Sequence, residues 1–232
     1  LITHIMLSNN RISFVKSLQQ KKCRVEEGLF VAEGDKLVRE YLQSAFEVDS
    51  VYASTDWLQR NGTLIKQPTE SAGVTEKDLS RMSSLVNAPE VLAVVRVPHY
   101  GIEITDLEKG LVLVLDGIRD PGNLGTILRS ALAFDLTNIV LDEFCADLYN
   151  HKTINSAKDA IFKLNIITDQ DLKIFKKIKT TMKVFTTSLQ AQNGLEVFKK
   201  EKKFCLVLGS EARGVDEKIQ KLSDGLTKIK TS

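Results

Sequence analysis

Four short runs of consecutive apolar residues in the second half of the chain most constrain its fold. A strand with one face in water alternates apolar and polar residues, whereas a strand covered on both faces is typically apolar throughout. The four runs are LVLVLD at 111–116, NIVLD at 138–142, KVFTTS at 183–188 and FCLVLGS at 204–210. We expect the helices at 124–134, 154–162, 170–179 and 216–222. This alternation predicts an α/β fold with a parallel sheet.

The first part of the chain alternates shorter segments of both kinds. Strand-like runs occupy 29–34, 48–54 and 91–97, and helix-like segments occupy 35–43, 55–61 and 76–85. The stretch PHYGIEITDLEKG that follows is polar and turn-rich, which is typical of a connection between domains. We therefore expect a small α/β domain at 1–98, a linker at 99–109 and a second domain at 110–232.

The composition excludes several classes of protein. Of the 232 residues, 43% are hydrophobic and 27% are charged, which is typical of an ordinary globular protein. No apolar run approaches the roughly 20 residues that cross a bilayer, and the first residues lack the pattern of a signal peptide. Cys23, Cys145 and Cys205 show no CxxC spacing, and the histidines are scattered. We expect a cytoplasmic protein with no metal ion and no membrane partner.

One segment near the start of the chain is basic. Between residues 11 and 24 there are five cations and no acidic residue. Such a run is either a solvated helix face or a surface that contacts nucleic-acid phosphates. On the second interpretation, the candidate phosphate-binding residues are Arg11, Lys21, Lys22 and Arg24.

The stretch LDGIRDPGNLGTILRSALAF, at 115–134, joins the end of an apolar run to a helix-like segment. Ligands of open parallel sheets collect where the strands end. Asn123 can cap the following helix, and Arg129 lies four residues after Gly125, so that its side chain leans back toward the strand end. Taken singly, these residues fit an ordinary cap and an exposed helix arginine. Together with the glycines and proline they favour a binding site, although GxGxxG and P-loop patterns are absent.

A second stretch, FCLVLGSEARGVDEKI at 204–219, has the same character. A buried run ends at Gly209, and a polar loop containing Glu211 and Gly214 leads into a helix. By itself Glu211 fits a helix-start anion or a salt bridge that fixes the loop. We expect the two loops to lie at one edge of the sheet, with a pocket beside Gly209.

Both stretches resemble motifs of the SpoU, or TrmH-like, RNA 2′-O-ribose methyltransferases. The first resembles motif one, and LVLGSEARGV resembles motif two. FVAEGDKLVREYL and NAPEVLAVVRVP resemble the small ribosomal-protein-like domain with which many members bind RNA. The resemblance implies a SPOUT-type α/β domain with a C-terminal trefoil knot, S-adenosylmethionine as methyl donor, RNA as substrate and a homodimer.

The resemblance also implies particular site residues. Asn123, Arg129 and Glu211 match the asparagine, arginine and glutamate of the catalytic motifs. Arg129 would pin a phosphate and stabilise developing alkoxide charge, since a guanidinium is a poor base. The residues that match the cofactor-binding positions are Thr187, Leu189, Leu208, Gly209 and Ile229.

Some positions depart from the family pattern. The third motif, which supplies part of the knot, does not occur within the 232 residues, so we expect the second domain to be incomplete at its C-terminal end. His151 stands where proline is usual, and Ser210 where asparagine is common. The leading expectation is a ribosomal RNA 2′-O-methyltransferase. The alternatives are a transfer RNA 2′-O-methyltransferase, a non-catalytic RNA-binding protein that retains the fold, and a methyltransferase acting on a small molecule or protein.

Overall fold

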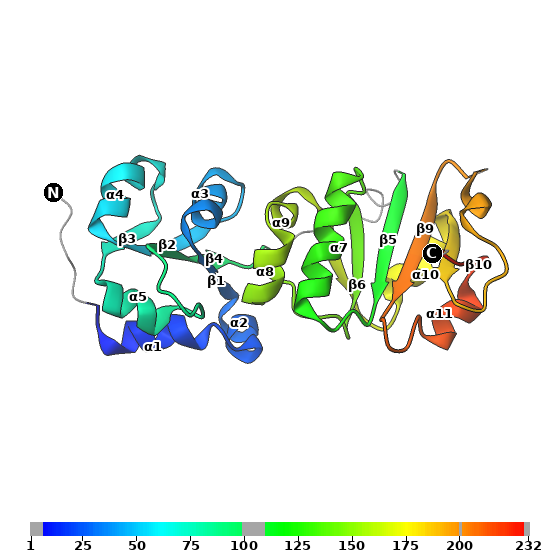
Figure 1. Ribbon diagram of the computed structural model, residues 1–232, viewed down its shortest axis with the longest axis horizontal. Helices are drawn as coiled ribbons and strands as arrows, with labels where there is room; N and C mark the ends of the chain where they lie inside the picture. The colour runs from blue at the N-terminus through cyan, green and yellow to red at the C-terminus, as the bar shows by residue number, and fades with distance from the viewer. Residues whose placement is uncertain (1–6, 99–109, 200, 230–232) are drawn as a thin grey trace. The chain divides into compact units, whose positions relative to one another are not determined.

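A computed structural model of the chain describes residues 7–98, 110–199 and 201–229, which fall into two compact units (Figure 1). The first unit combines the described residues before the gap at 99–109 with Tyr149–Phe162. The second combines residues 110–148 with the described residues from Lys163 onward. Each unit contains its own sheet.

The first unit is built on a four-stranded sheet in the order β1-β4-β2-β3. Its strands are β1 (Leu29–Glu33), β2 (Val48–Ala53), β3 (Glu70–Gly73) and β4 (Val91–Arg96). β4 runs antiparallel to both β1 and β2, and β3 runs parallel to β2. The sequence analysis missed β3, because its residues ESAG include no large apolar or β-branched side chain.

Helices cover both faces of this sheet (Figure 1). They are α1 (Asn9–Ser17), α2 (Lys21–Glu27), α3 (Asp35–Gln43), α4 (Thr55–Asn61), the 3₁₀ turn η1 (Gly62–Leu64) and α5 (Glu76–Met82). α1 and α5 bury Val15 and Met82 against Val31 and Val94 on one face. α3 lies on the other face and buries Leu37, Val38 and Tyr41.

Two further helices, which lie in the chain between strands of the second sheet, belong to the first unit by their packing. They are α8 (His151–Ala157) and α9 (Ala160–Lys163), separated by Lys158 at a φ of 55°. The ring of Tyr149 stacks on Phe30 with centroids 4.7 Å apart, and Phe162 meets Tyr41 edge-on at 4.4 Å. The single helix expected at 154–162 is therefore two short helices, and aromatic contacts fix them to the first sheet.

The second unit contains a six-stranded sheet in the order β10-β8-β9-β5-β6-β7, and every neighbouring pair is parallel. Its strands are β5 (Leu111–Asp116), β6 (Asn138–Asp142), β7 (Asn165–Asp169), β8 (Lys183–Thr187), β9 (Phe204–Gly209) and β10 (Gly225–Thr227). The predicted α/β fold with a parallel sheet is confirmed. All six carboxyl ends lie at one edge, where ligands of such sheets bind.

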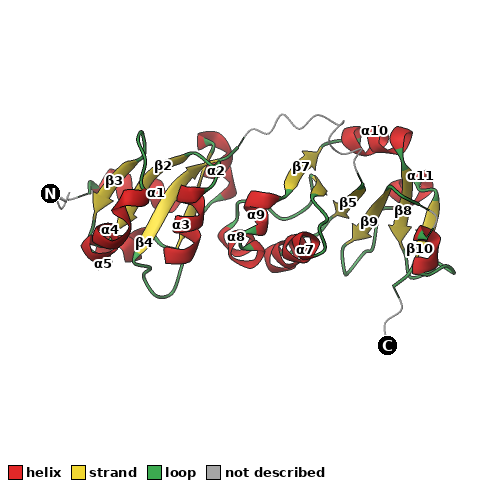
Figure 2. Ribbon diagram, turned by 90° about the horizontal axis from the view of Figure 1, so that it is seen from above, coloured by secondary structure: helices red, strands yellow, loops and turns green. Residues whose placement is uncertain are grey.

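The remaining helices flank this sheet (Figure 2). They are α7 (Pro121–Ala133), α10 (Lys173–Thr181), α11 (Glu217–Leu222) and the 3₁₀ turn η2 (Leu195–Phe198). α10 and α11 bury Phe175, Ile178 and Ile219 on one face. α7 lies on the opposite face and buries Leu124, Leu128 and Ala131.

The start of α7 differs from the expected one. The helix begins at Pro121, and its N-cap is Asp120, whose Oδ1 accepts a hydrogen bond from the Asn123 N–H at 2.7 Å. The prediction that Asn123 caps the helix is therefore wrong. Because Asp120 takes that role and Pro121 fits the first helical position, the Asn123 side chain is left exposed within the first turn.

Candidate functional site

The two glycine-bearing loops lie side by side at the carboxyl edge of the second sheet. β5 and β9 are neighbours, with Asp116 opposite Gly209 in the register. Between the loops that follow these strands is a cavity of about 430 Å³. Its lining comprises Gly117, Ile118, Arg119, Asp120, Asn123, Thr126, Ile127, Gly209, Ser210, Glu211, Ala212 and Arg213. This volume is in the range of a small-molecule or nucleotide site.

The loop after β5 is fixed by residues at the end of β6 and just beyond it. The Gly117 N–H donates to Asp142 Oδ1 at 3.0 Å, and the Ile118 N–H donates to Cys145 Sγ at 3.3 Å. The Cys145 thiol in turn donates to the Leu115 carbonyl at 3.3 Å. Burial raises the pKa of Cys145 to about 12, so the thiol keeps the proton that this bond requires. The backbone from Leu115 to Ile118, which leads into the cavity, is thus held by Asp142 and Cys145.

The loop after β9 is a tight turn that requires glycine. A Cβ atom on Gly209 would lie 2.1 Å from the carbonyl carbon of Gly214. Gly214 has a φ of +70°, and its N–H donates to the Ser210 carbonyl at 2.8 Å. The two glycines therefore allow the loop to fold back on itself at the cavity wall.

A buried carboxyl joins the two loops. Asp116 Oδ2, at the end of β5, accepts a hydrogen bond from the Asp216 N–H at 2.6 Å. Burial raises the pKa of Asp116 from 3.8 to about 6; the bond from Asp216 opposes this shift, and the nearby Asp142 adds to it. Asp116 ties the end of β5 to the start of α11, which follows the second loop.

The structure brings two of the three candidate catalytic residues into the cavity. Asn123 lines it from α7, and Glu211 lines it from the loop after β9. Arg129 is exposed on α7 outside the lining, and Gly125 is buried. The expected position of Arg129 over Gly125 stays a prediction, but Arg129 does not line the cavity of its own chain.

The five candidate cofactor residues lie at or just beyond the carboxyl ends of β8, β9 and β10. The Thr187 hydroxyl donates to the Val207 carbonyl at 3.1 Å, next to Leu208 and Gly209. Leu189, after β8, is 99% exposed, and Ile229, after β10, is 59% exposed. In the sheet order, β9 lies between β5 on one side and β8 and β10 on the other. The loop after β9 thus has the cavity on the side of β5 and the exposed Leu189 and Ile229 on the side of β8 and β10.

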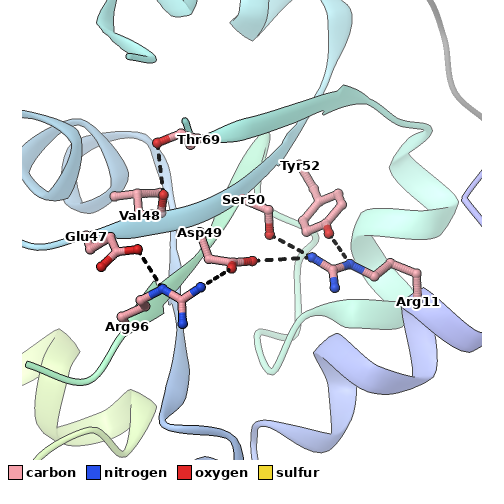
Figure 3. A network of polar contacts seen from close by, with 8 residues as sticks. All are labelled: Arg11, Glu47, Val48, Asp49, Ser50, Tyr52, Thr69 and Arg96. Carbon is pink, nitrogen blue, oxygen red and sulfur yellow. Dashed lines mark hydrogen bonds and ion pairs between the residues drawn. The ribbon is translucent and has the colours of Figure 1, made fainter. Parts of the chain in front are cut away.

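Among the candidate phosphate-binding residues, Arg11 is occupied within the first unit (Figure 3). Its Nε donates to the Tyr52 hydroxyl, and its Nη2 donates to Ser50 Oγ at 3.1 Å. The same nitrogen lies 3.5 Å from Asp49, which also pairs with Arg96. Arg11 therefore joins α1 to β2.

Arg24 is likewise structural, since it is only 5% exposed. Its Nη1 donates to the carbonyls of Leu18 and Gln19 at 2.8 and 2.7 Å, just beyond the end of α1. This burial leaves Arg24 without a surface for a phosphate. Lys21 and Lys22 are exposed, and Lys22 lies 3.8 Å from Glu26. A basic run cannot reveal from its composition which of its cations face inward.

Sequence reasoning did not select Arg119 and Arg213 as site residues, although both line the cavity. Their positions carried a signal, because each stands in a loop that directly follows a buried strand. In the described parts of the chain there is no group of histidine, cysteine and acidic residues that could hold a metal ion. None of the described helices is both long enough and apolar enough to cross a membrane.

A parallel sheet with a cavity between the loops that follow two adjacent strands is typical of α/β proteins that bind a ligand at the carboxyl edge. Residues 110–232 match the SpoU rRNA Methylase family, and this match covers just over half of the chain. The chain therefore belongs to the SpoU rRNA methylase family, and the resemblance of its two motifs is confirmed. Residues 9–93 match the MRM3-like substrate binding domain.

Similar proteins extend over most of the chain. The 23S rRNA (guanosine(2553)-2′-O)-methyltransferase RlmP of Bacillus subtilis is 28% identical over 221 residues, which cover 93% of this chain and 85% of RlmP. The mitochondrial rRNA methyltransferase 3 of Xenopus laevis is 30% identical over 72% of this chain, which spans only 41% of that protein.

Solved structures share the fold. A putative RNA methyltransferase of the TrmH family from Porphyromonas gingivalis superposes with a TM-score of 0.83 at 27% identity, over 98% of this chain and 90% of that one. An AdoMet-bound rRNA methyltransferase from Sinorhizobium meliloti superposes with a TM-score of 0.87 at 23% identity. The superposition covers all of this chain and 90% of that one.

Proposed function

We propose that this chain transfers a methyl group from S-adenosylmethionine to a ribose 2′-hydroxyl of ribosomal RNA. The observation that carries the proposal is the cavity between the two family motifs, where Asn123 and Glu211 face the same space from α7 and from the loop after β9. The rRNA 2′-O-methyltransferase of Bacillus subtilis, similar over 93% of this chain, supports the choice of substrate.

The cofactor fits the far side of the loop after β9. Leu189 and Ile229 are large apolar side chains left exposed where β8 and β10 end, and a bound adenine ring would cover such surface. Thr187, Leu208 and Gly209 complete this candidate cofactor site. S-adenosylmethionine supplies a methyl group on a positively charged sulfur, which is electrophilic without a metal ion.

The target ribose belongs on the cavity side of the same loop. There Asn123 can hold a ribose hydroxyl through its amide. The Glu211 carboxylate can accept a hydrogen bond from the 2′-hydroxyl and take its proton as that oxygen bonds to the methyl group and the carbon–sulfur bond breaks. Holding the ribose in line with the methyl donor supplies a large part of the rate acceleration.

Arg129 acts from α7 on a phosphate or on the developing alkoxide charge. Since Arg129 lies outside the cavity of its own protomer, the proposal includes a homodimer in which α7 of one copy approaches the site of the other. Sedimentation equilibrium tests this part, and a strictly monomeric active enzyme would contradict it.

The first unit serves as the RNA-binding part of the enzyme. Its match to the MRM3-like substrate binding domain and the exposed Lys21 and Lys22 support this role. The proposed division is an RNA-binding domain at 1–98, a linker at 99–109 and the methyltransferase domain at 110–232. Three free cysteines and an rRNA substrate support a cytoplasmic location.

The test combines methyl transfer with cofactor binding. The purified full-length protein is incubated with methyl-labelled S-adenosylmethionine and unmodified rRNA or tRNA, and labelled positions are mapped by their resistance to alkaline cleavage. Label at a ribose of rRNA is the expected result, and the guanosine named for the Bacillus subtilis relative is the first position to examine. Label in tRNA alone would identify tRNA, and not rRNA, as the substrate. No label, with no heat of cofactor binding, would favour a non-catalytic RNA-binding protein.

A further inference from the structure

Two arginines outside the matched catalytic positions line the candidate active-site cavity from its two walls. Arg119 stands in the loop after β5, directly before the cap of α7, and Arg213 stands in the loop after β9. Both side chains are exposed, and neither forms an ion pair with any residue that the structure describes. Two arginines without an ion-pair partner among the described residues thus line one small space.

The backbone that carries each arginine is held in place. The Ile118 carbonyl, one residue before Arg119, accepts a hydrogen bond from the Ala146 N–H at 2.8 Å. The Arg213 N–H donates to Ser210 Oγ at 3.2 Å, inside the turn closed by Ser210 and Gly214. A side chain on a backbone held in this way loses less freedom on binding a ligand than one on a mobile loop.

The acidic residues of the cavity do not balance the charge of the two arginines. The Asp120 carboxylate is used as the helix cap and lies at the positive end of α7. Glu211 is therefore the acid without such a partner, against two arginines. This balance suits a ligand that carries more than one negative charge and also presents a hydroxyl group to Glu211.

We propose that Arg119 and Arg213 bind the two phosphates that flank the target ribose in the RNA strand. This inference rests on the proposed function and extends it from the reacting group to its neighbours. A guanidinium binds a phosphate through two parallel hydrogen bonds, which fixes its orientation as well as its distance. Two such interactions, one from each wall, set the ribose between Asn123 and Glu211.

The test measures RNA affinity, cofactor affinity and turnover separately in the full-length protein. In Arg119→Ala and Arg213→Ala, we expect the Kd for an rRNA substrate to rise about tenfold per arginine. The slope of log affinity against log salt concentration should become shallower by about 0.7 for each phosphate that the variant no longer binds. The Kd for S-adenosylmethionine should stay unchanged. Arg119→Lys and Arg213→Lys should keep part of the affinity but lose turnover, because the charge remains while the orienting pair of bonds does not.

The matched control removes two exposed cations elsewhere in the second unit. Lys176 and Lys177 lie on α10, across the sheet from α7, so Lys176→Ala/Lys177→Ala should leave RNA affinity as in the wild type. An equal loss in this control would reveal a general charge effect and overturn the proposal. So would weakened S-adenosylmethionine binding with unchanged RNA affinity, which would assign the arginines to the cofactor carboxylate. If the wild type methylates rRNA and the arginine variants have the same RNA affinity and turnover, this inference alone is overturned. If the wild type itself is inactive, the proposed function is overturned.

Discussion

Asp116 lies where the two loops of the candidate site meet, and its environment makes the site sensitive to pH. The carboxyl is 7% exposed, accepts the Asp216 N–H and lies near the carboxyl of Asp142. Because its pKa is raised from 3.8 to about 6, the folded protein holds a proton in this interval that the unfolded chain releases. The stability contributed by Asp116 is therefore fully present below pH 4 and lost as the pH rises through 6.

Asp116→Asn tests this relation. The amide keeps an oxygen for the Asp216 N–H and removes the ionisation, so the variant should gain stability over the wild type between pH 4 and 6, by up to about 3 kcal/mol. Urea denaturation from pH 4 to 7.5 measures the difference. A flat difference for Asp116→Asn would show that its carboxyl titrates normally.

The turn after β9 depends on the absence of a single side chain. In Gly209→Ala the new Cβ would overlap the Gly214 carbonyl carbon at 2.1 Å, so Gly214 must move away from Gly209 and the turn must open. We expect a loss of more than about 2 kcal/mol of stability and the loss of cofactor binding. Gly62→Ala is the control, since nothing lies within 4 Å of its Cβ position and its φ is −58°. Thermal unfolding and calorimetry should separate the two variants, and equal behaviour would argue against the close approach.

The first turn of α7 contains a structural residue, the cap Asp120, and a candidate functional residue, Asn123. Asp120→Ala removes the cap and should lower stability by about 1 kcal/mol. Asn123→Ala removes a side chain that caps nothing, so stability should change by less than about 0.5 kcal/mol while methyl transfer falls sharply. Denaturation and activity measured on both variants test the assignment. Equal destabilisation by the two substitutions would restore Asn123 as a cap.

The strands and helices that could be predicted from the sequence are those for which a single local pattern, such as an apolar run, is sufficient. The runs of β5 and β6 are buried almost throughout, so composition alone identified these two strands. β8 and β9 were also identified, although β9 alternates buried and partly buried residues. The start of α7 was misread because Asp120 and Asn123 are both good caps, and only the backbone shows which is used. Arg24 was misread because its direction depends on where α1 ends. The two facing loops of the cavity could be predicted because β5 and β9 are neighbours in the sheet, whereas Arg213 and Arg119 could be placed in the cavity only from the structure.

Across the whole chain, the least predictable feature is the packing of residues 149–162 with the first unit. These residues follow β6 and precede β7, within the part that matches the SpoU family. Their aromatic rings nevertheless join Phe30, Tyr41 and Phe46 of the first unit. The compact unit is thus discontinuous in sequence, because the core of the first unit uses rings that the chain supplies only later.

This discontinuity gives a prediction for local stability. Phe162→Ala removes the ring that packs edge-on against Tyr41 and Phe46, so the first unit should be destabilised by about 2 kcal/mol. Hydrogen exchange should accelerate in α3 and β1, which surround these rings, and stay unchanged in β5 and β9. Phe134→Ala makes the same chemical change at a ring that is 77% exposed, and it should alter neither region. Removal of a ring should speed hydrogen exchange in the core that contains the ring. Faster exchange in β5 and β9 alone would therefore show that residues 149–162 pack with the second unit.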